Sequence, residues 1–159
     1  MANLDLLENS IPVAPLKLAA LPGSMEMSKK VDSYLVQFRK ELAERRNGVS
    51  FSGYSEDSFL IDCECPRFGS GEAKGKINES VRGADLYILV DVCNYSITYK
   101  VCGYENHMSP DDHYQDLKRI ISAATGKAHR INVIMPFLYE GRQHRRTKRE
   151  SMDCALMLQ

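Results

Sequence analysis

The sequence predicts an α/β domain of three layers, in which a mainly parallel sheet lies between helices. Strand-like and helix-like segments alternate along 159 residues, which is the length of one compact domain. Two nearly continuous apolar runs, 86–92 and 130–137, are typical of strands that are buried on both faces of a parallel sheet. Two longer segments place apolar residues at three- and four-residue steps, which indicates amphipathic helices.

The first part of the chain predicts a strand followed by a long helix. Residues 1–14 carry no pattern and are expected to be a lead-in to a domain that covers 15–159. The apolar run 16–21 predicts the first strand, because a Pro-Gly pair ends it. Ser24 is then the expected N-cap of a helix over 25–46, and the Asn-Gly pair after this helix supplies its stop.

The middle of the chain predicts two further strands around a glycine-rich loop. Residues 59–65 are strand-like and end at a proline, and residues 67–72 then read Arg-Phe-Gly-Ser-Gly-Glu. Residues 73–77 predict the next strand, and a turn at 81–84 leads into the buried strand 86–92.

The last part of the chain predicts a loop, a helix, a buried strand and a final helix. Residues 94–108 are polar, aromatic and irregular, which favours a loop. Ser109 is the expected N-cap of the second helix, because a proline and two aspartates follow it, and Gly126 ends that helix. The strand 130–137 comes next. The final helix, 151–159, stops on apolar residues without a cap, so we expect the sequence to be part of a longer protein.

Charge and cysteine content argue against several classes of protein. The chain has 21 Lys and Arg against 21 Asp and Glu, so it has no bulk attraction to nucleic acid or to an anionic membrane. Its first residues lack the pattern of a signal peptide, so none is expected, and no run of about 18 apolar residues could cross a membrane. Its five cysteines and scattered histidines match no disulfide or metal-site spacing. Reduced thiols in a cytoplasmic protein, without a metal site, are the simplest interpretation.

One segment departs from this neutral background. Residues 142–149 read RQHRRTKR, with five basic residues and no acid, directly after a predicted buried strand. Ligands of parallel sheets bind at the carboxyl ends of the strands, where Arg142 and Arg145 could present planar guanidinium groups to phosphate oxygens. A solvated basic linker has the same composition. A nucleic-acid patch would need more basic residues elsewhere and interleaved aromatic residues.

Four segments in this order resemble the ribose-phosphate pyrophosphokinase family (phosphoribosyl pyrophosphate synthetases). Loop 67–72 resembles the family's R-F-[SP]-[DN]-G-E loop, and residues 78–85 resemble its E-x-V-R-G-x-D motif before a buried strand. Residues 133–137 and 141–146 resemble its V-I-P-Y and Y-A-R-Q-D-R-K motifs, and the turn 22–24 lies where the family has S-G-N. The resemblance covers nearly the whole chain but only the N-terminal half of the family's two-domain architecture.

The resemblance implies a phosphoribosyltransferase-like fold and a part in making phosphoribosyl pyrophosphate. The family moves the diphosphoryl group of ATP to the 1-hydroxyl of ribose 5-phosphate, with Mg²⁺. By resemblance, Arg142 and Gln143 contact ATP, while Phe68, Ser70 and Glu72 build the adenine pocket of a neighbouring subunit. A homo-oligomer is therefore expected.

Several features of the family are missing or altered in these 159 residues. The family's metal-binding histidine segment, catalytic flexible loop and ribose-phosphate loop have no counterpart, so we expect the chain alone to be inactive and to hold no catalytic residue. His144 replaces the family's Asp, Ser70 replaces its loop Asp or Asn, and residues 94–108 match poorly. A non-catalytic regulatory paralogue and a different phosphate- or nucleotide-binding α/β module are the alternative interpretations.

Overall fold

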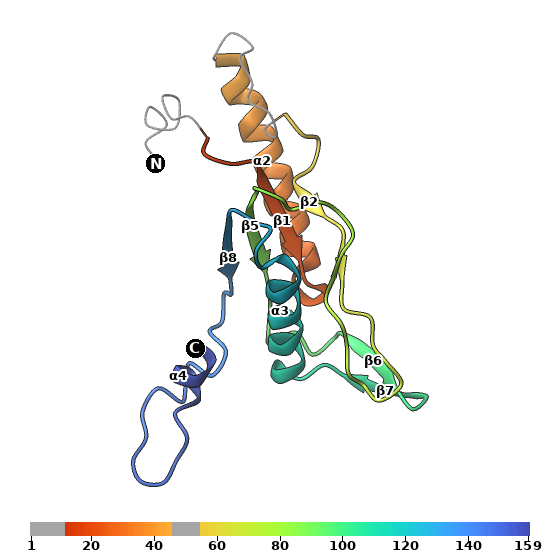
Figure 1. Cartoon of the computed structure of the whole chain (residues 1–159), viewed down its shortest axis with the longest axis vertical. Helices are drawn as coiled ribbons and strands as arrows, with labels where there is room; N and C mark the ends of the chain where they lie inside the picture. The colour runs from red at the N-terminus through yellow and green to blue at the C-terminus, as the bar shows by residue number, and fades with distance from the viewer. Residues whose placement is uncertain (1–11, 46–54) are drawn as a thin grey trace.

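A four-stranded parallel sheet forms the centre of the computed structural model, which describes residues 12–45 and 55–159 (Figure 1). The strand order is β2-β1-β5-β8, and every neighbouring pair is parallel. The predicted α/β class with a parallel sheet is therefore confirmed. The strands are β1 (Leu16–Ala20), β2 (Leu60–Ile61), β5 (Asp85–Leu89) and β8 (Arg130–Ile134).

Helices cover both faces of this sheet. Successive side chains of a strand point to opposite faces, so neighbouring residues of one strand pack against different helices. On β1, Leu18 faces the helix α2 (Met25–Arg45), whose Val31 packs against the same cluster. The next residue, Ala19, faces the helix α3 (Pro110–Ala124) and belongs to one cluster with Ile120. Burial on both faces explains the apolar run of β5 and gives the three layers that the sequence predicts.

The helix α3 begins at the capping box that the sequence indicates. The Ser109 hydroxyl accepts a hydrogen bond from the Asp112 backbone N–H at 3.2 Å, and the Asp112 carboxylate accepts one from the Ser109 N–H at 2.9 Å. These two bonds satisfy donors that a helix N-terminus otherwise leaves free. The helix ends at Ala124, and Gly126 follows its C-cap residue Thr125, as predicted.

The start of α2 differs from the prediction. Ser24 is not an N-cap, because a short 3-10 turn, η1 (Pro22–Ser24), precedes the helix. The buried Ser24 hydroxyl instead hydrogen-bonds the carbonyl oxygens of Leu21 and Leu89, at 2.9 and 2.7 Å, and so ties the end of β1 to that of β5. The Asn-Gly pair predicted to stop α2 lies outside the described residues.

The predicted strand 59–65 divides into two short strands that belong to different sheets. Its first part, β2, pairs with β1. Its second part, β3 (Cys63–Glu64), pairs antiparallel with β4 (Lys76–Ile77). The division occurs at Asp62, because its N–H donates to the Glu79 carboxylate and its carbonyl accepts from the Asn78 N–H, at 3.0 and 2.9 Å.

The prediction of an irregular loop over 94–108 is wrong. This segment contains a β-hairpin, in which β6 (Thr98–Val101) pairs antiparallel with β7 (Tyr104–His107). Cys102 and Gly103 form its two-residue turn with φ values of +50° and +87°. Positive φ at both central residues is the turn geometry that matches the twist of paired strands.

The interpretation of 130–137 as a strand buried on both faces is also wrong. The strand β8 pairs only with β5, so it lies at an edge of the described sheet, and Val133 and Ile134 are each 41% exposed. The strand stops at Ile134, and the chain then leaves the sheet (Figure 1). The last helix, α4 (Asp153–Met157), is shorter than the predicted 151–159. None of the described helices is both long and apolar enough to cross a membrane.

Candidate functional site

The crevice between β1 and β5 is filled by protein groups, although ligands of open α/β sheets commonly bind at such a point. The Asn94 side-chain amide donates to the Gly23 carbonyl at 2.9 Å, which joins the loops that follow these two strands. His113 is 1% exposed, and its Nε2 lies 2.8 Å from the Asn94 carbonyl oxygen. His113 is thus a core histidine whose ring has a hydrogen-bond partner. Loop 67–72 and the basic segment 142–149 are both mostly exposed, as are Cys93 and Tyr95 in the loop after β5.

Loop 67–72 is a tight turn with an outward-facing aromatic ring. The Phe68 N–H donates to the Glu72 carbonyl at 2.7 Å, and the Gly71 N–H donates to the Phe68 carbonyl at 2.9 Å. The Phe68 side chain is exposed, and the Ser70 hydroxyl donates to the Glu72 carboxylate at 2.9 Å. The turn therefore brings an aromatic face and a carboxylate together at the surface, two groups that can stack on a purine and accept from its amine.

A buried ion-pair group anchors this loop to α3. The Arg67 guanidinium contacts the Asp116 carboxylate at 2.8 Å, and Arg119 contacts its other oxygen at 2.6 Å. The side chains of Arg67 and Asp116 are only 11% and 4% exposed. Burial raises the pKa of Asp116 above its usual value, and the two guanidinium groups oppose that rise. Sequence reasoning missed this group, because Asp116 lies 49 positions from Arg67 and reads as an ordinary helix acid.

The basic segment 142–149 protrudes from the body of the molecule beyond β8 (Figure 1). Gln143 shapes its base, since its side-chain amide donates to the carbonyls of Arg145 and Ser151 at 3.0 and 2.9 Å. Arg142 and Arg145 are exposed and form no ion pair with any described residue. Their guanidinium groups are therefore free to meet an anion.

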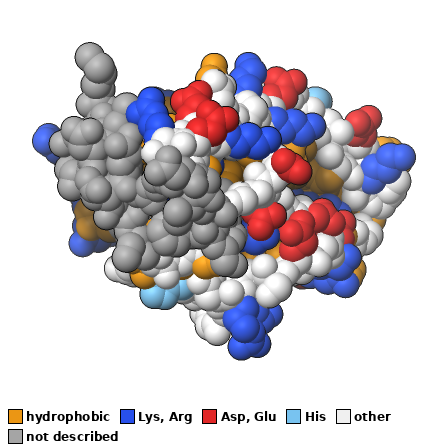
Figure 2. Space-filling model, turned by 90° about the horizontal axis from the view of Figure 1, so that it is seen from above, with side chains coloured by type: hydrophobic (Ala, Val, Ile, Leu, Met, Phe, Trp, Pro, Cys, Tyr) orange, Lys and Arg blue, Asp and Glu red, His pale blue; other side chains and the backbone are white. Residues whose placement is uncertain are grey.

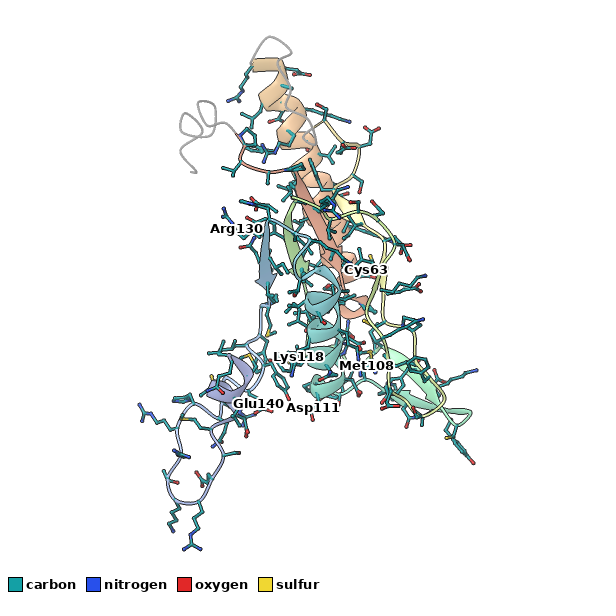
Figure 3. All side chains as sticks on the ribbon, viewed as in Figure 1. Cys63, Met108, Asp111, Lys118, Arg130 and Glu140 are labelled. Carbon is teal, nitrogen blue, oxygen red and sulfur yellow. The ribbon has the colours of Figure 1, made fainter. Side chains whose placement is uncertain are left out.

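Aromatic contacts anchor the two ends of this protruding segment on α3. The rings of Tyr139 and Tyr114 are stacked with centroids 4.4 Å apart. The Tyr139 hydroxyl donates to Asp111 at 2.6 Å, and the Tyr114 hydroxyl donates to the Met157 carbonyl at 2.6 Å. Burial, with the bond to Asp111, raises the pKa of Tyr139. Figure 3 labels Asp111 at the start of α3 and Glu140 on the adjoining segment.

The six predicted site residues form two separate groups within one chain. Loop 67–72, which contains Phe68, Ser70 and Glu72, lies beside the β6–β7 hairpin, whereas the basic segment with Arg142, Gln143 and Arg145 follows β8 on the other side of α3 (Figure 1). No hydrogen bond or ion pair between described residues joins the two groups. On the face of the molecule shown in Figure 2, positive and negative side chains are intermixed.

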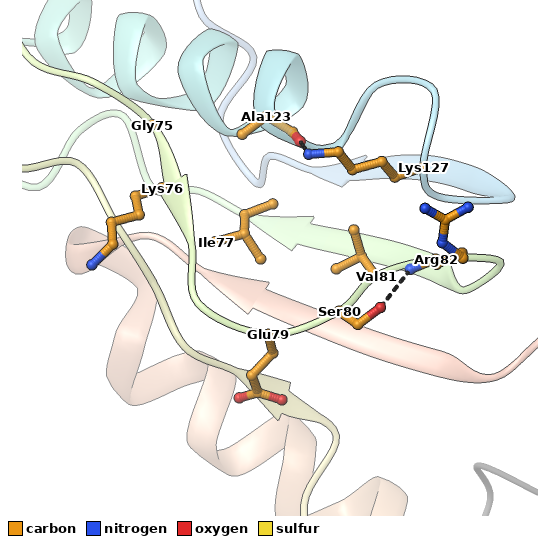
Figure 4. A pocket seen from close by; sticks show the side chains of 9 residues that line it. All are labelled: Gly75, Lys76, Ile77, Glu79, Ser80, Val81, Arg82, Ala123 and Lys127. Atoms are coloured by element: carbon orange, nitrogen blue, oxygen red, sulfur yellow. Dashed lines mark hydrogen bonds between the residues drawn. The ribbon is translucent and has the colours of Figure 1, made fainter.

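A pocket of about 520 Å³ lies at the opposite end of the sheet, beside the residues that precede β5 and β8. Figure 4 shows Arg82 and Lys127 on one side of it and Lys76 and Glu79 on the other. The Lys127 ammonium donates to the Ala123 carbonyl at 3.4 Å. None of the six predicted site residues lines this pocket.

The described residues contain no cluster of side chains typical of an all-protein metal site. Across 12–45 and 55–159, no three His, Cys, Asp or Glu side chains gather as metal ligands. The carboxylate of Asp91, which ends the β5 region, accepts a hydrogen bond from the Cys93 N–H at 3.0 Å and so shapes its own turn.

The sequence matches a model of the N-terminal domain of ribose phosphate pyrophosphokinase over residues 16–159. The chain belongs to the ribose-phosphate pyrophosphokinase family. The match includes loop 67–72, the hairpin and the basic segment, and it confirms the resemblance found in the sequence.

Two known proteins illustrate how far this similarity extends. Ribose-phosphate pyrophosphokinase B of Dictyostelium discoideum is 32% identical over 93 residues, which cover 57% of this chain and 24% of that protein. The phosphoribosylpyrophosphate synthetase structure from Mycobacterium smegmatis matches 90% of this chain and 37% of its own, with a TM-score of 0.55 and 21% identity. At that identity the structural match supports the fold alone. The chain thus spans about a quarter of the curated relative's length.

Proposed function

We propose that this chain is the ATP-contacting and oligomerising N-terminal part of a ribose-phosphate pyrophosphokinase, which converts ATP and ribose 5-phosphate to phosphoribosyl pyrophosphate and AMP. The family match over 16–159 carries the proposal. In this reaction the 1-hydroxyl oxygen of the sugar bonds to the β-phosphorus of ATP. The bond from that phosphorus to the α,β-bridging oxygen breaks, AMP leaves, and the hydroxyl gives up its proton.

Arg142 and Arg145 of the basic segment would bind the polyphosphate of ATP. Arg142 and Arg145 are exposed and unpaired among the described side chains, and guanidinium groups bind phosphate oxygens through charge-assisted, often bidentate hydrogen bonds. Gln143 would fix their position, since its side-chain amide donates to the carbonyls of Arg145 and Ser151 and so ties the two ends of this segment together. Mg²⁺, when bound to ATP, supplies further charge neutralisation. Catalysis of phosphoryl transfer consists mostly of such positioning and charge stabilisation.

The adenine base would be bound by Phe68, Ser70 and Glu72 of a neighbouring subunit. The separation of these residues from the basic segment supports this arrangement, because one chain does not bring the two groups together. A homo-oligomer would then complete each site with one group from each of two subunits.

The first test is the substitution Arg142→Ala, which removes one charge-assisted contact to phosphate. Such contacts are worth about 1.5–3 kcal/mol, so we expect ATP affinity to fall roughly 10- to 100-fold. Titration calorimetry with ATP measures this directly. The matched control is Arg149→Ala, which removes the same charge from the same exposed segment but lies outside the Arg-Gln motif. Equal affinities of wild type and Arg142→Ala would refute the assignment.

A regulatory paralogue is the second candidate function, and His144 is the observation that favours it. This residue is exposed at the position where the resemblance expects a fixed negative charge. AMP release from ATP and ribose 5-phosphate by the full-length protein separates the two candidates, because normal turnover eliminates the regulatory one.

A further inference from the structure

We propose that the β6–β7 hairpin is a brace that fixes loop 67–72 in its ligand-ready conformation, with Tyr99 as the positioning residue. The inference rests on the proposed role of this loop in binding the adenine of ATP. The hairpin lies in residues 94–108, the segment that matches the family's pattern poorly.

The hairpin packs directly against the backbone of the loop. The Cys102 N–H, in the hairpin turn, donates to the Gly69 carbonyl at 3.1 Å. Gly71 has a φ of +91°, and a Cβ atom there would lie 2.9 Å from Val101 Cγ2. The loop thus turns at a residue where glycine avoids both backbone strain and collision with the hairpin.

Tyr99 completes the brace by holding Arg67. The guanidinium carbon of Arg67 lies 4.5 Å from the centroid of the Tyr99 ring, within the range of a cation–π interaction. The same guanidinium donates to the Gly71 carbonyl at 3.3 Å and to Asp116 at 2.8 Å. The Tyr99 hydroxyl donates to Asp112, in the first turn of α3, at 3.3 Å. Tyr99 therefore connects the loop to the capped end of this helix.

A fixed loop has a direct consequence for binding. Phe68 and Glu72 must hold one arrangement to stack on and hydrogen-bond a purine, and a loop that is already ordered loses less entropy when the ligand binds. The hairpin contacts the loop and the first turn of α3, and no hydrogen bond or ion pair between described residues joins it to the basic segment. It should therefore change nucleotide affinity without changing the bond-making step.

Amide hydrogen exchange of Phe68 and Gly71 tests the brace without reference to function, because both N–H groups donate within the loop. In the full chain, we expect Tyr99→Leu to speed their exchange about tenfold, because that is the effect of losing one partly buried cation–π contact. Tyr99→Phe keeps the ring and should retain most of the protection. The control is Tyr104→Leu, the same change at a 78% exposed position of the hairpin. Unchanged exchange in Tyr99→Leu overturns the proposal.

A second variant and a kinetic measurement separate bracing from general destabilisation. Val101→Ala removes the methyl groups that occupy the space beside Gly71, where a Cβ would collide with them, and should loosen the loop in the same way. A large drop in unfolding midpoint, with faster exchange throughout the molecule, would overturn the proposal. In the full-length enzyme, both Tyr99→Leu and Val101→Ala should raise the KM for ATP several-fold, while kcat and the KM for ribose 5-phosphate stay unchanged. Faster loop exchange with unchanged ATP affinity would uphold the brace and refute the loop's nucleotide role.

Discussion

At the scale of single residues, the five cysteines divide by environment. Burial raises the pKa of Cys63 to about 11 and that of Cys65 to about 12, and the negative charges of Asp62 and Asp116 add to these shifts. Cys93 and Cys102 are exposed. The thiolate is the reactive form of cysteine, so a raised pKa makes a thiol inert at neutral pH.

We therefore predict selective alkylation. At pH 8, iodoacetamide followed by mass spectrometry should find Cys93 and Cys102 modified first, with Cys63 roughly 100-fold slower, since each unit of pKa lowers the thiolate fraction about tenfold. The pKa of Cys63 is higher in the folded protein than in the unfolded chain, so the fold favours the neutral thiol. This contribution to the free energy of unfolding is fully present below about pH 9 and is lost as pH rises through about 11. Modification of all cysteines at equal rates would contradict this environment.

At the scale of elements, α3 organises both candidate groups. Its first turn binds Tyr139 through Asp111 and Tyr99 through Asp112, and Asp116 holds Arg67 one turn later. The capping box at Ser109 fixes the start of this helix, so a local sequence signal sets the position of distant side chains.

Removal of this cap should lower stability. Ser109→Ala deletes the hydroxyl that accepts from the Asp112 N–H, and loss of an N-cap costs about 1 kcal/mol. Urea unfolding followed by circular dichroism measures the change. The control is Ser122→Ala, an exposed position inside the same helix, where alanine should be neutral or slightly stabilising. If the two variants unfold at the same urea concentration, the cap does not stabilise the fold.

At the scale of the whole molecule, a shared site predicts that two defective subunits can complement each other. Phe68→Ala and Arg142→Ala should each lower the activity of the full-length enzyme at least tenfold. After unfolding and joint refolding at equal amounts, mixed dimers should restore about a quarter of wild-type activity, since half of the dimers are mixed and half of their sites are intact. Mixed oligomers without recovered activity would refute the shared site.

Some elements could be predicted because their signals are local. The spacing of apolar residues identified α2 and α3, and the apolar run of β5 indicated a strand covered on both faces. The same signal failed for β8, since an apolar run does not reveal whether its strand is central or at an edge. The hairpin was missed because Cys102-Gly103 is a less common form of the two-residue turn than Asn-Gly.

By itself the sequence determined the fold class, the cap of α3, the family and the residue types offered to phosphate and purine. Each of these depends on neighbouring residues or on a short motif. Only the tertiary structure decided that β8 lies at the sheet edge, that Arg67 pairs with Asp116, and that the two candidate groups lie on different sides of α3. These features depend on contacts between residues far apart in the chain, and the path of the backbone sets those contacts.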